Sequence, residues 1–282
     1  LTMNIRKNKT FQKAIHNKSV VIGTVMVLIV IFIAVFAPVL SPYDLDAMNM
    51  DQALKAPGSE HLLGTDQYGR DMMTRIFYGA RISLIVGFVS VFFSMIIGVV
   101  IGLIAGYYGG WVDSLIGRII DVFLSFPVLL LAIALVAVLG GGTVSVIISL
   151  CLVSWTQYAR VVRSSVLGIR EEEYVLAAKT FGASNKRILF KYIIPNALAP
   201  IIVVATLGIG TAIVSEATLS FMGLGVQPPT PSWGYALSFG LRYMRTAAHM
   251  ATIPGLAIMF TVLGFNLLGN GIRDITDPRM VN

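Results

Sequence analysis

The sequence has little charge and almost no cysteine. Only 12% of its 282 residues are charged, against roughly a quarter in an average soluble domain, whereas 56% are hydrophobic and the mean hydropathy is +0.81. The single cysteine, Cys151, excludes an internal disulfide and a zinc site built from cysteines. It lies in an apolar run, where we expect a packed thiol. The composition therefore predicts a membrane protein.

Motifs for nucleotide, metal or covalent chemistry are also missing. No GxxxxGK[ST] phosphate loop occurs, the three histidines (His16, His61 and His249) form no i, i+4 metal pair, and no Ser–His–Asp set has a believable spacing. We predict no catalytic residue, no metal ligand and no cofactor on this chain. The net charge of +7 does not predict nucleic-acid binding, because the basic residues are not gathered on a soluble domain.

The sequence does contain repeated apolar runs of about 20 residues, the length that crosses a bilayer's hydrocarbon core. Backbone polar groups in lipid need internal partners, so continuous runs predict helices. We predict an all-α integral membrane protein with about six transmembrane helices, at Val20–Leu40, Ile82–Ala105, Leu115–Leu139, Val144–Val166, Ile193–Met222 and Ala251–Leu268. The first run, about 21 residues, exceeds the apolar core of a signal peptide, so we interpret it as a retained span.

Lysine and arginine are unevenly divided between the two sides. Six spans place both termini on one side, and that side receives fifteen of the 21 Lys and Arg residues. The positive-inside rule therefore places both termini in the cytoplasm. This predicts a basic cytoplasmic tail at 1–19, a first span with an external cap segment at 20–81, and a transmembrane domain at 82–282 with a cytoplasmic loop at 167–192.

Three glycines of the second span, Gly98, Gly102 and Gly106, are spaced four residues apart. This spacing puts them on one helical face, where a missing side chain lets another helix approach closely. We interpret them as packing residues, within this subunit or against a partner.

A charged segment, "EEEYVLAAKTFGASNKRILFKYIIPN", separates two apolar runs at residues 171–196. Apolar residues recur at helical spacing on both sides of Gly182, at Tyr174, Ala178, Phe181, Ile188 and Tyr192. A glycine commonly ends a helix, Ser184 can cap a second helix, and Pro195 marks the entry to the next span. We predict a helix, a glycine turn and a second helix.

This hairpin has two possible uses. A basic amphipathic stretch often lies on lipid headgroups; alternatively, the hairpin docks into a groove on a cytoplasmic partner. Small residues that permit close approach favour docking, namely Ala177, Ala178, Gly182 and Ala183, whereas Arg187 and Lys191 lie on the polar side of the second helix.

"AAKTFG", followed after nine residues by "YIIP", resembles the coupling loop of binding-protein-dependent ABC importer permeases. Three further stretches resemble the dipeptide, oligopeptide and nickel branch of that family, "HLLGTDQYGRDMMTRIFYGARISL" (61–84), "LSFMGLGVQPPTPSWG" (219–234) and "GFNLLGNGIRDITDP" (264–278). Two positions depart from the pattern: Leu176 stands where the loop usually has a glutamate, and Asn270 where an aspartate is common.

The resemblance implies a type I ABC importer permease fold in a prokaryotic inner membrane. The chain would form half of a translocation pathway for peptides or for nickel or other metal chelates. Its implied partners are a second homologous permease, two ATP-binding cassette ATPases that carry ATP and Mg, and an external substrate-binding protein. In this family the loop fits a cleft of the ATPase, which implies coupling roles for Tyr174, Ala177, Ala178, Phe181, Gly182, Ala183, Arg187 and Pro195. The chain itself would not be an enzyme.

Ionisable residues inside spans are functional candidates, and we single out Glu216. It follows Pro195 by about 21 residues, roughly 32 Å along a helix, which places it near the outer, partly wet end of the fifth span. It either lines the outer mouth of the path or bonds to a neighbouring helix. Arg118 and Asp121, three residues apart, could pair at the inner end of the third span.

Two questions stay open. An ion-coupled secondary transporter is the alternative function, although such proteins tend to show inverted repeats and charged groups near the membrane midplane, and the sequence has no convincing repeat. The substrate is also open between peptides, glutathione-like compounds and metal chelates. The stretch "SWTQYARVVRS" (154–164) looks more like the nickel-type members.

Overall fold

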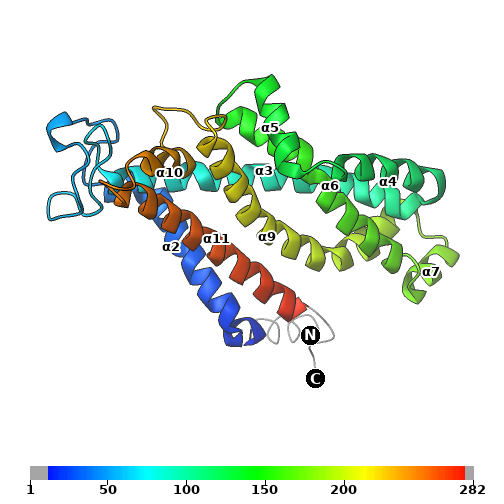
Figure 1. The fold of residues 1–282 in the computed structure, drawn as a ribbon. Coiled ribbons are helices and arrows are strands. Elements are labelled where there is room, and N and C mark those ends of the chain that lie inside the picture. Colours follow the sequence, from blue (N-terminus) through cyan, green and yellow to red (C-terminus); the bar gives the residue numbers. More distant parts are fainter. Residues whose placement is uncertain (1–11, 277–282) are drawn as a thin grey trace.

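The computed structural model describes residues 12–276, which are mainly helical (Figure 1). This range contains no β-strand, only an isolated bridge between Thr65 and Asp71. Most of the predicted basic tail, as well as Arg279, lies outside the described residues.

Five helices are long and apolar enough to cross a membrane. They are α2 (Lys18–Leu40), α3 (Met72–Tyr108), α6 (Thr143–Ile169), the continuous helix Asn185–Phe221 that contains α8 and α9, and α11 (His249–Thr276). A bent pair, α4 (Gly110–Leu124) and α5 (Val128–Leu139), makes a sixth crossing if the two count as one span. The prediction of about six membrane helices is confirmed.

The third predicted span is not one straight helix. Its two halves, α4 and α5, meet at 84°. The break falls at Ser125–Pro127, where the proline has no N–H to donate and also disfavours helical geometry in the residue before it. The Ser125 hydroxyl donates to the carbonyl of Val122 at 2.7 Å and closes the end of α4. The predicted helix over 115–139 was therefore wrong in shape.

Helix α3 begins ten residues before the predicted start of the second span, at Met72 rather than Ile82. The Asp71 carboxylate causes this early start, because it accepts a hydrogen bond from the backbone N–H of Thr74 at 2.7 Å and so caps the helix. The first turns carry Arg75 and Arg81, whose charge hid them from a search for apolar runs.

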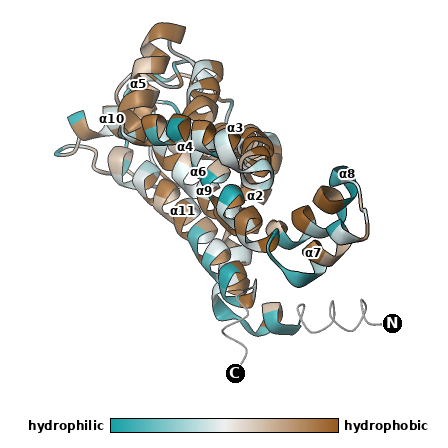
Figure 2. Cartoon of the chain, turned by 90° about the vertical axis from the view of Figure 1, so that its right-hand side faces the viewer, coloured by the Kyte–Doolittle hydropathy of each residue, from teal (hydrophilic) through white to brown (hydrophobic). Residues whose placement is uncertain are grey.

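The membrane helices form two packed groups that share buried side chains. Helix α3 lies along α6, while α11 lies between α2 and α9 (Figure 1). Fully buried side chains such as Val86, Val146, Ile213 and Phe265 join these helices. In Figure 2 the spans are mostly hydrophobic, and hydrophilic residues collect at α7 (Glu173–Thr180), α8 (Asn185–Ile188) and the described chain ends.

The two ends of the described chain lie together, because Val20 of α2 packs against Gly271 of α11. They lie toward the same end of the bundle as α7 (Figure 1). The opposite end carries residues 41–71, named here the cap segment, and α10 (Trp233–Arg242). An even number of crossings between the chain ends fits this arrangement.

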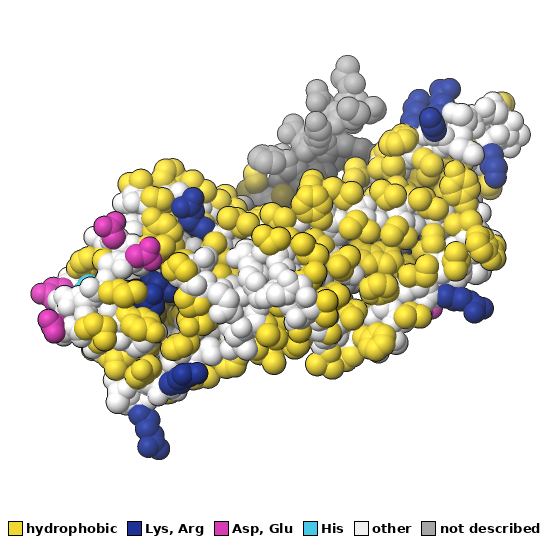
Figure 3. All heavy atoms as spheres, turned by 90° about the horizontal axis from the view of Figure 1, so that it is seen from above, with side chains coloured by type: hydrophobic (Ala, Val, Ile, Leu, Met, Phe, Trp, Pro, Cys, Tyr) yellow, Lys and Arg dark blue, Asp and Glu magenta, His cyan; other side chains and the backbone are white. Residues whose placement is uncertain are grey.

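The cap segment is ordered by buried, paired charges. The Asp66 carboxylate accepts from Arg70 Nε at 2.7 Å, and both side chains are about 95% buried. His61 lies between Asp71 Oδ1, 3.0 Å from its Nδ1, and Gln52 Oε1, 2.8 Å from its Nε2. Most acidic side chains in view in Figure 3 gather at this end of the molecule. These buried contacts give the cap segment a defined structure.

Candidate functional site

The α7–α8 region, residues 173–193, is named here the hairpin segment. Helix α7 ends at Thr180, Gly182 takes the left-handed φ of +77° that favours glycine, and the Ser184 hydroxyl caps α8 by accepting from the N–H of Arg187 at 3.4 Å. The predicted helix, glycine turn and helix are all present.

The second helix of the hairpin segment does not stop before the membrane span. It continues through one π-helical turn, η2 (Leu189–Ile193), into α9 (Ile194–Phe221). Pro195 is the second residue of α9 and directly follows the π-helical turn. It has no N–H to donate, so the continuous helix lacks one backbone hydrogen bond at this point. No loop separates the hairpin segment from the span.

The predicted apolar stripe does not face inward as a whole. The buried residues are Val175 and Ile188, 3% and 1% exposed, which pack with Val166 and Ile193. Phe181, by contrast, is 90% exposed at the turn. The other predicted coupling residues are exposed (Tyr174, Ala177, Arg187, Pro195) or half-buried (Ala178, Ala183).

Polar contacts hold the hairpin segment against α3. The Tyr107 hydroxyl donates to Asn185 Oδ1 at 2.8 Å, and Arg170 Nη1 donates to the carbonyl of Gly106 at 2.9 Å. The segment is therefore fixed on the side of the spans, where Ala183 packs with its buried residues, while Phe181 and Gly182 stay exposed.

The three glycines of α3 face α6. A Cβ atom added to Gly98 would lie 2.8 Å from the backbone N of Ala159, one on Gly102 would lie 2.6 Å from the carbonyl oxygen of Ala159, and one on Gly106 would lie 2.8 Å from Val166 Cβ. No real Cβ contact is so short, so α3 and α6 can approach this closely only with glycine here. The stripe packs within the subunit.

Glu216 is fully buried, not partly wet. Its oxygens accept hydrogen bonds from three serine hydroxyls, Ser220 in α9 at 2.8 Å, Ser232 before α10 at 3.0 Å and Ser83 in α3 at 3.1 Å. This arrangement ties three elements together at the cap end of the molecule. It matches the bonding role that we considered for this residue.

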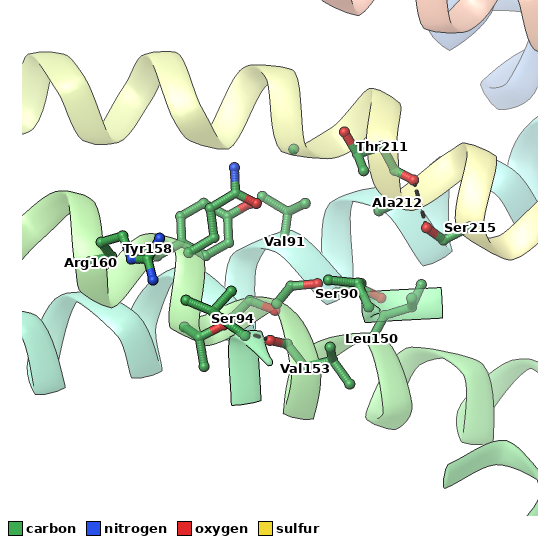
Figure 4. Close-up of a pocket in the computed structure, with 16 residues that line it drawn as sticks. Ser90, Val91, Ser94, Leu150, Val153, Tyr158, Arg160, Thr211, Ala212 and Ser215 are labelled. Atoms are coloured by element: carbon green, nitrogen blue, oxygen red, sulfur yellow. Dashed lines mark hydrogen bonds between the residues drawn. The ribbon is translucent and has the colours of Figure 1, made fainter. Parts of the chain in front are cut away.

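A polar cavity of about 220 Å³ lies between α3, α6 and α9, with the α4–α5 bend at its edge (Figure 4). Its wall includes apolar side chains such as Leu150, Val153 and Ala212. It also includes seven hydroxyl-bearing side chains, those of Ser90, Ser94, Ser154, Thr156, Tyr158, Thr211 and Ser215. A cavity with so many polar groups in a membrane protein is suited to water or a polar ligand.

The hydroxyls of the cavity wall differ in their bonding. Ser215 donates to the carbonyl of Thr211 at 3.0 Å and Thr156 to that of Val153 at 3.1 Å, which leaves their lone pairs free to accept. Ser90, only 2% exposed, has no hydrogen-bond partner among the described residues. An unpaired buried hydroxyl is costly, and the Ser90 oxygen is itself closed off from the cavity, with less than 1 Å² of accessible surface.

The mouth of the cavity is formed by Gln157 and Arg160 of α6. Arg160 stands nine residues before the end of α6 at Ile169, roughly 13 Å along the helix. Its Nη2 lies 3.6 Å from Asp121 Oδ1 of α4. Arg163 forms a closer, two-fold contact with Asp113, also in α4, with Nη2 to Oδ2 at 2.8 Å.

Sequence reasoning missed Arg160 and Arg163 as membrane residues, because it assigned both to the basic cytoplasmic side. The signal was present: the predicted span 144–166 already contained the polar run "SWTQYARVVRS". Asp121 pairs with Arg160 and not, as predicted, with Arg118. Two ion pairs therefore connect α4 to α6.

No group of three metal-ligating side chains comes together anywhere in residues 12–276. His61 belongs to the cap contacts described above, and His249 Nε2 lies 3.0 Å from the carbonyl oxygen of Thr65. Both histidines thus serve the cap end of the fold.

Two family models match the sequence. One, described as a binding-protein-dependent transport system inner membrane component, matches residues 98–282. The other, described as the N-terminal TM domain of oligopeptide transport permease C, matches residues 8–57.

Several proteins are similar over nearly the whole sequence. The dipeptide transport system permease protein DppC of Alkalihalophilus pseudofirmus is 48% identical, over 96% of this chain and 90% of that protein. The di/tripeptide transport system permease protein DppC of Pseudomonas aeruginosa is 41% identical, over 96% and 92%. The glutathione transport system permease protein GsiD of Shigella flexneri is 46% identical, over 92% and 86%.

Among solved structures, an inward-facing MetNI methionine ABC transporter contains a similar chain. The two agree with a TM-score of 0.60 at 22% sequence identity, over 73% of this chain and 98% of that one. At that identity the likeness concerns the fold alone.

Proposed function

This chain belongs to the family of binding-protein-dependent transport system inner membrane components, and from that premise we propose that it is the permease subunit of an ATP-driven importer of short peptides or glutathione-like compounds. It is a multi-pass inner-membrane protein with the type I ABC importer permease fold. The substrate proposal is supported by relatives named for dipeptides and glutathione at 41–48% identity.

The hairpin segment is the observation that best supports coupling to a partner ATPase. Val175 and Ile188 anchor it to the spans, whereas Phe181 at its turn is 90% exposed. An exposed aromatic on a fixed support is what a docking site on another protein needs. We assign Phe181, Gly182 and the small residues beside them to the cleft of a partner ATPase, which binds the ATP and Mg.

The polar face between α6 and α9 is proposed to line the path. Gln157 and Arg160 would be costly against lipid, so this face is expected to meet water and a second, homologous permease. Glu216 then supports the outer end of the path from within the protein. An external binding protein is proposed to deliver substrate at the cap end.

The orientation follows from charge. Fifteen of the 21 Lys and Arg residues are assigned to the hairpin side and six to the cap side. The positive-inside rule still places both termini and the hairpin segment in the cytoplasm.

The test is to purify the protein from its own membranes, identify the proteins that accompany it and assay ATP hydrolysis and uptake in proteoliposomes. We expect a homologous permease and ATPases to co-purify, and labelled dipeptide or glutathione to be taken up with ATP. Uptake of nickel–histidine instead would overturn the substrate proposal. A protein that purifies alone and transports with an ion gradient would support the secondary transporter.

A further inference from the structure

The polar cavity has an asymmetric charge. Arg160 at its mouth is the one charged residue that lines it within residues 12–276, and no lining residue is acidic. The cavity of about 220 Å³ is large compared with the roughly 10–15 Å³ that a single water needs. It therefore suits an occupant that has one anionic end and an otherwise neutral, polar body.

Arg160 is available to such an occupant. Its contact with Asp121 is 3.6 Å long, and the two side chains are 57% and 76% exposed, conditions under which an ion pair is weak. Arg163, one turn further along α6, is held in a stronger ion pair. It makes a two-fold contact with Asp113, and the two side chains are 33% and 18% exposed. A guanidinium group bonds a carboxylate through two parallel N–H donors.

The wall behind Arg160 offers neutral hydrogen-bonding groups. The exposed side-chain amide of Gln157 can donate, and the hydroxyls of Ser215 and Thr156, already donors to their own helix, can accept. Backbone C=O and N–H groups, common to all peptides, match this set irrespective of side chain. The apolar part of the wall, Leu150 and Val153, leaves room for a small side chain.

We propose that this cavity is a binding site for a peptide in transit, in which Arg160 receives the C-terminal carboxylate and the hydroxyls of α3, α6 and α9 receive the peptide backbone. The inference rests on the proposed function and deepens it. It makes the permease selective for a free C-terminus, in addition to any selection by the external binding protein.

The test uses the assembled importer in proteoliposomes, without the external binding protein. The probes are a diazirine-bearing dipeptide, glycyl-photoleucine, and its C-terminal amide. After illumination, labelled positions are read by mass spectrometry. We expect the acid to label residues 150–160 of α6 and 208–215 of α9, and the amide to label them at least tenfold less. Equal labelling by acid and amide, or labelling only elsewhere, would overturn the proposal.

Variants locate the effect on the guanidinium. Arg160→Gln should reduce labelling by the acid to the level of the amide, and Ser215→Ala should weaken both probes alike. Arg118→Gln, an exposed arginine of α4 outside the cavity, is the matched control and should leave labelling unchanged. If the acid still exceeds the amide in Arg160→Gln, Arg160 is not the carboxylate receptor. Should that variant fail to assemble, the comparison of acid and amide on the unchanged importer decides.

The two levels of inference fail separately. Without ATP-dependent peptide uptake by the unchanged importer, the proposed function fails. With uptake intact but no difference between acid and amide, only the assignment of the cavity fails.

Discussion

The cap segment and the hairpin segment both join spans outside the membrane, yet they differ in which side chains they bury and which they expose. In the cap, charged groups are buried and paired, with Asp66 and Arg70 at 3% and 5% exposure. In the hairpin, charges lie on the surface and an aromatic, Phe181, is 90% exposed. The cap pairs its buried charges, Asp66 with Arg70 and His61 with Asp71, whereas the hairpin leaves an apolar side chain in water.

Because of this difference, we expect the cap to determine the stability of the subunit and the hairpin to determine its assembly with partners. A buried ion pair that loses one partner leaves an uncompensated charge inside the protein, so changes in the cap should destabilise the subunit itself. An exposed side chain has little to lose in the isolated subunit, so changes at the hairpin turn should be felt only when a partner binds.

The largest effect is expected at Gly182. Valine there would have to adopt a φ of +77°, which is strained for a β-branched residue, although no atom lies within 4 Å of the new Cβ. We expect Gly182→Val to lower ATP-driven uptake by about 100-fold or more while membrane insertion and the packing of the spans stay intact, because the strained turn no longer fits its partner.

Gly223→Val is the matched control, because Gly223 has a φ of +78° and the same open surroundings, just beyond the C-terminal end of α9. Uptake in proteoliposomes and Tm in detergent are measured for both. Normal uptake by Gly182→Val with the ATPases still bound would contradict the role of the turn.

The next effect is expected in the cap. Asp66→Ala removes the partner of Arg70 and the acceptor for the backbone N–H groups of Tyr68 and Arg70. We expect a loss of about 3–5 kcal/mol in local stability, measured as faster amide hydrogen exchange over residues 61–75. Asp51→Ala, on an exposed carboxylate of the same segment, should exchange normally. Unchanged exchange in Asp66→Ala would remove the contrast between the two segments.

A smaller effect is expected from Phe181→Ala. If Phe181 enters a cleft of the ATPase, its truncation should weaken ATPase binding by about 2 kcal/mol, roughly 30-fold. The affinity is measured with the permease in nanodiscs. Phe92→Ala, which removes an exposed aromatic of α3, is the control and should bind normally. A change in Tm without a change in affinity would show that Phe181 serves the fold.

The smallest effect is expected at Glu60, the exposed member of the cap's charges. The ammonium group of Lys55 lowers the pKa of Glu60 below its usual 4.5 through a hydrogen bond and its charge. A lowered pKa means that any contribution to stability is present at neutral pH and is lost as the pH falls through the pKa of the folded state. Because the pair is solvent-exposed, Glu60→Gln should leave the Tm at pH 7 unchanged. A clear drop would mean that exposed charges also hold the cap together.

The spans were predictable because apolar length is a local property of the sequence. The bend at Ser125–Pro127 had a local signal too, but the apolar residues on both sides of Pro127 concealed it. The face of the hairpin was harder to predict. Val175 and Ile188 are buried because they meet Val166 and Ile193, and spacing within the hairpin alone could not choose between them and Phe181.

The partners of Glu216 could not be predicted at all. Its hydroxyl donors include Ser83 and Ser232, 133 and 16 residues away in the sequence, so only the packing of α3 and α9 brings them together. Arg160, on the other hand, was visible as an arginine inside a predicted span. The positive-inside count assigned Arg160 to the cytoplasmic side, so the cost of placing this arginine in lipid was not considered.

The π turn Leu189–Ile193 has a mechanical consequence. Helix α8, this turn and α9 form one continuous helix of 37 residues, about 55 Å long at 1.5 Å per residue. The hairpin is therefore joined to the span without a flexible loop. A displacement of the hairpin by a partner protein would be transmitted along this helix to its far end. There Glu216 and its three serines join α9 to α3 and to the segment before α10.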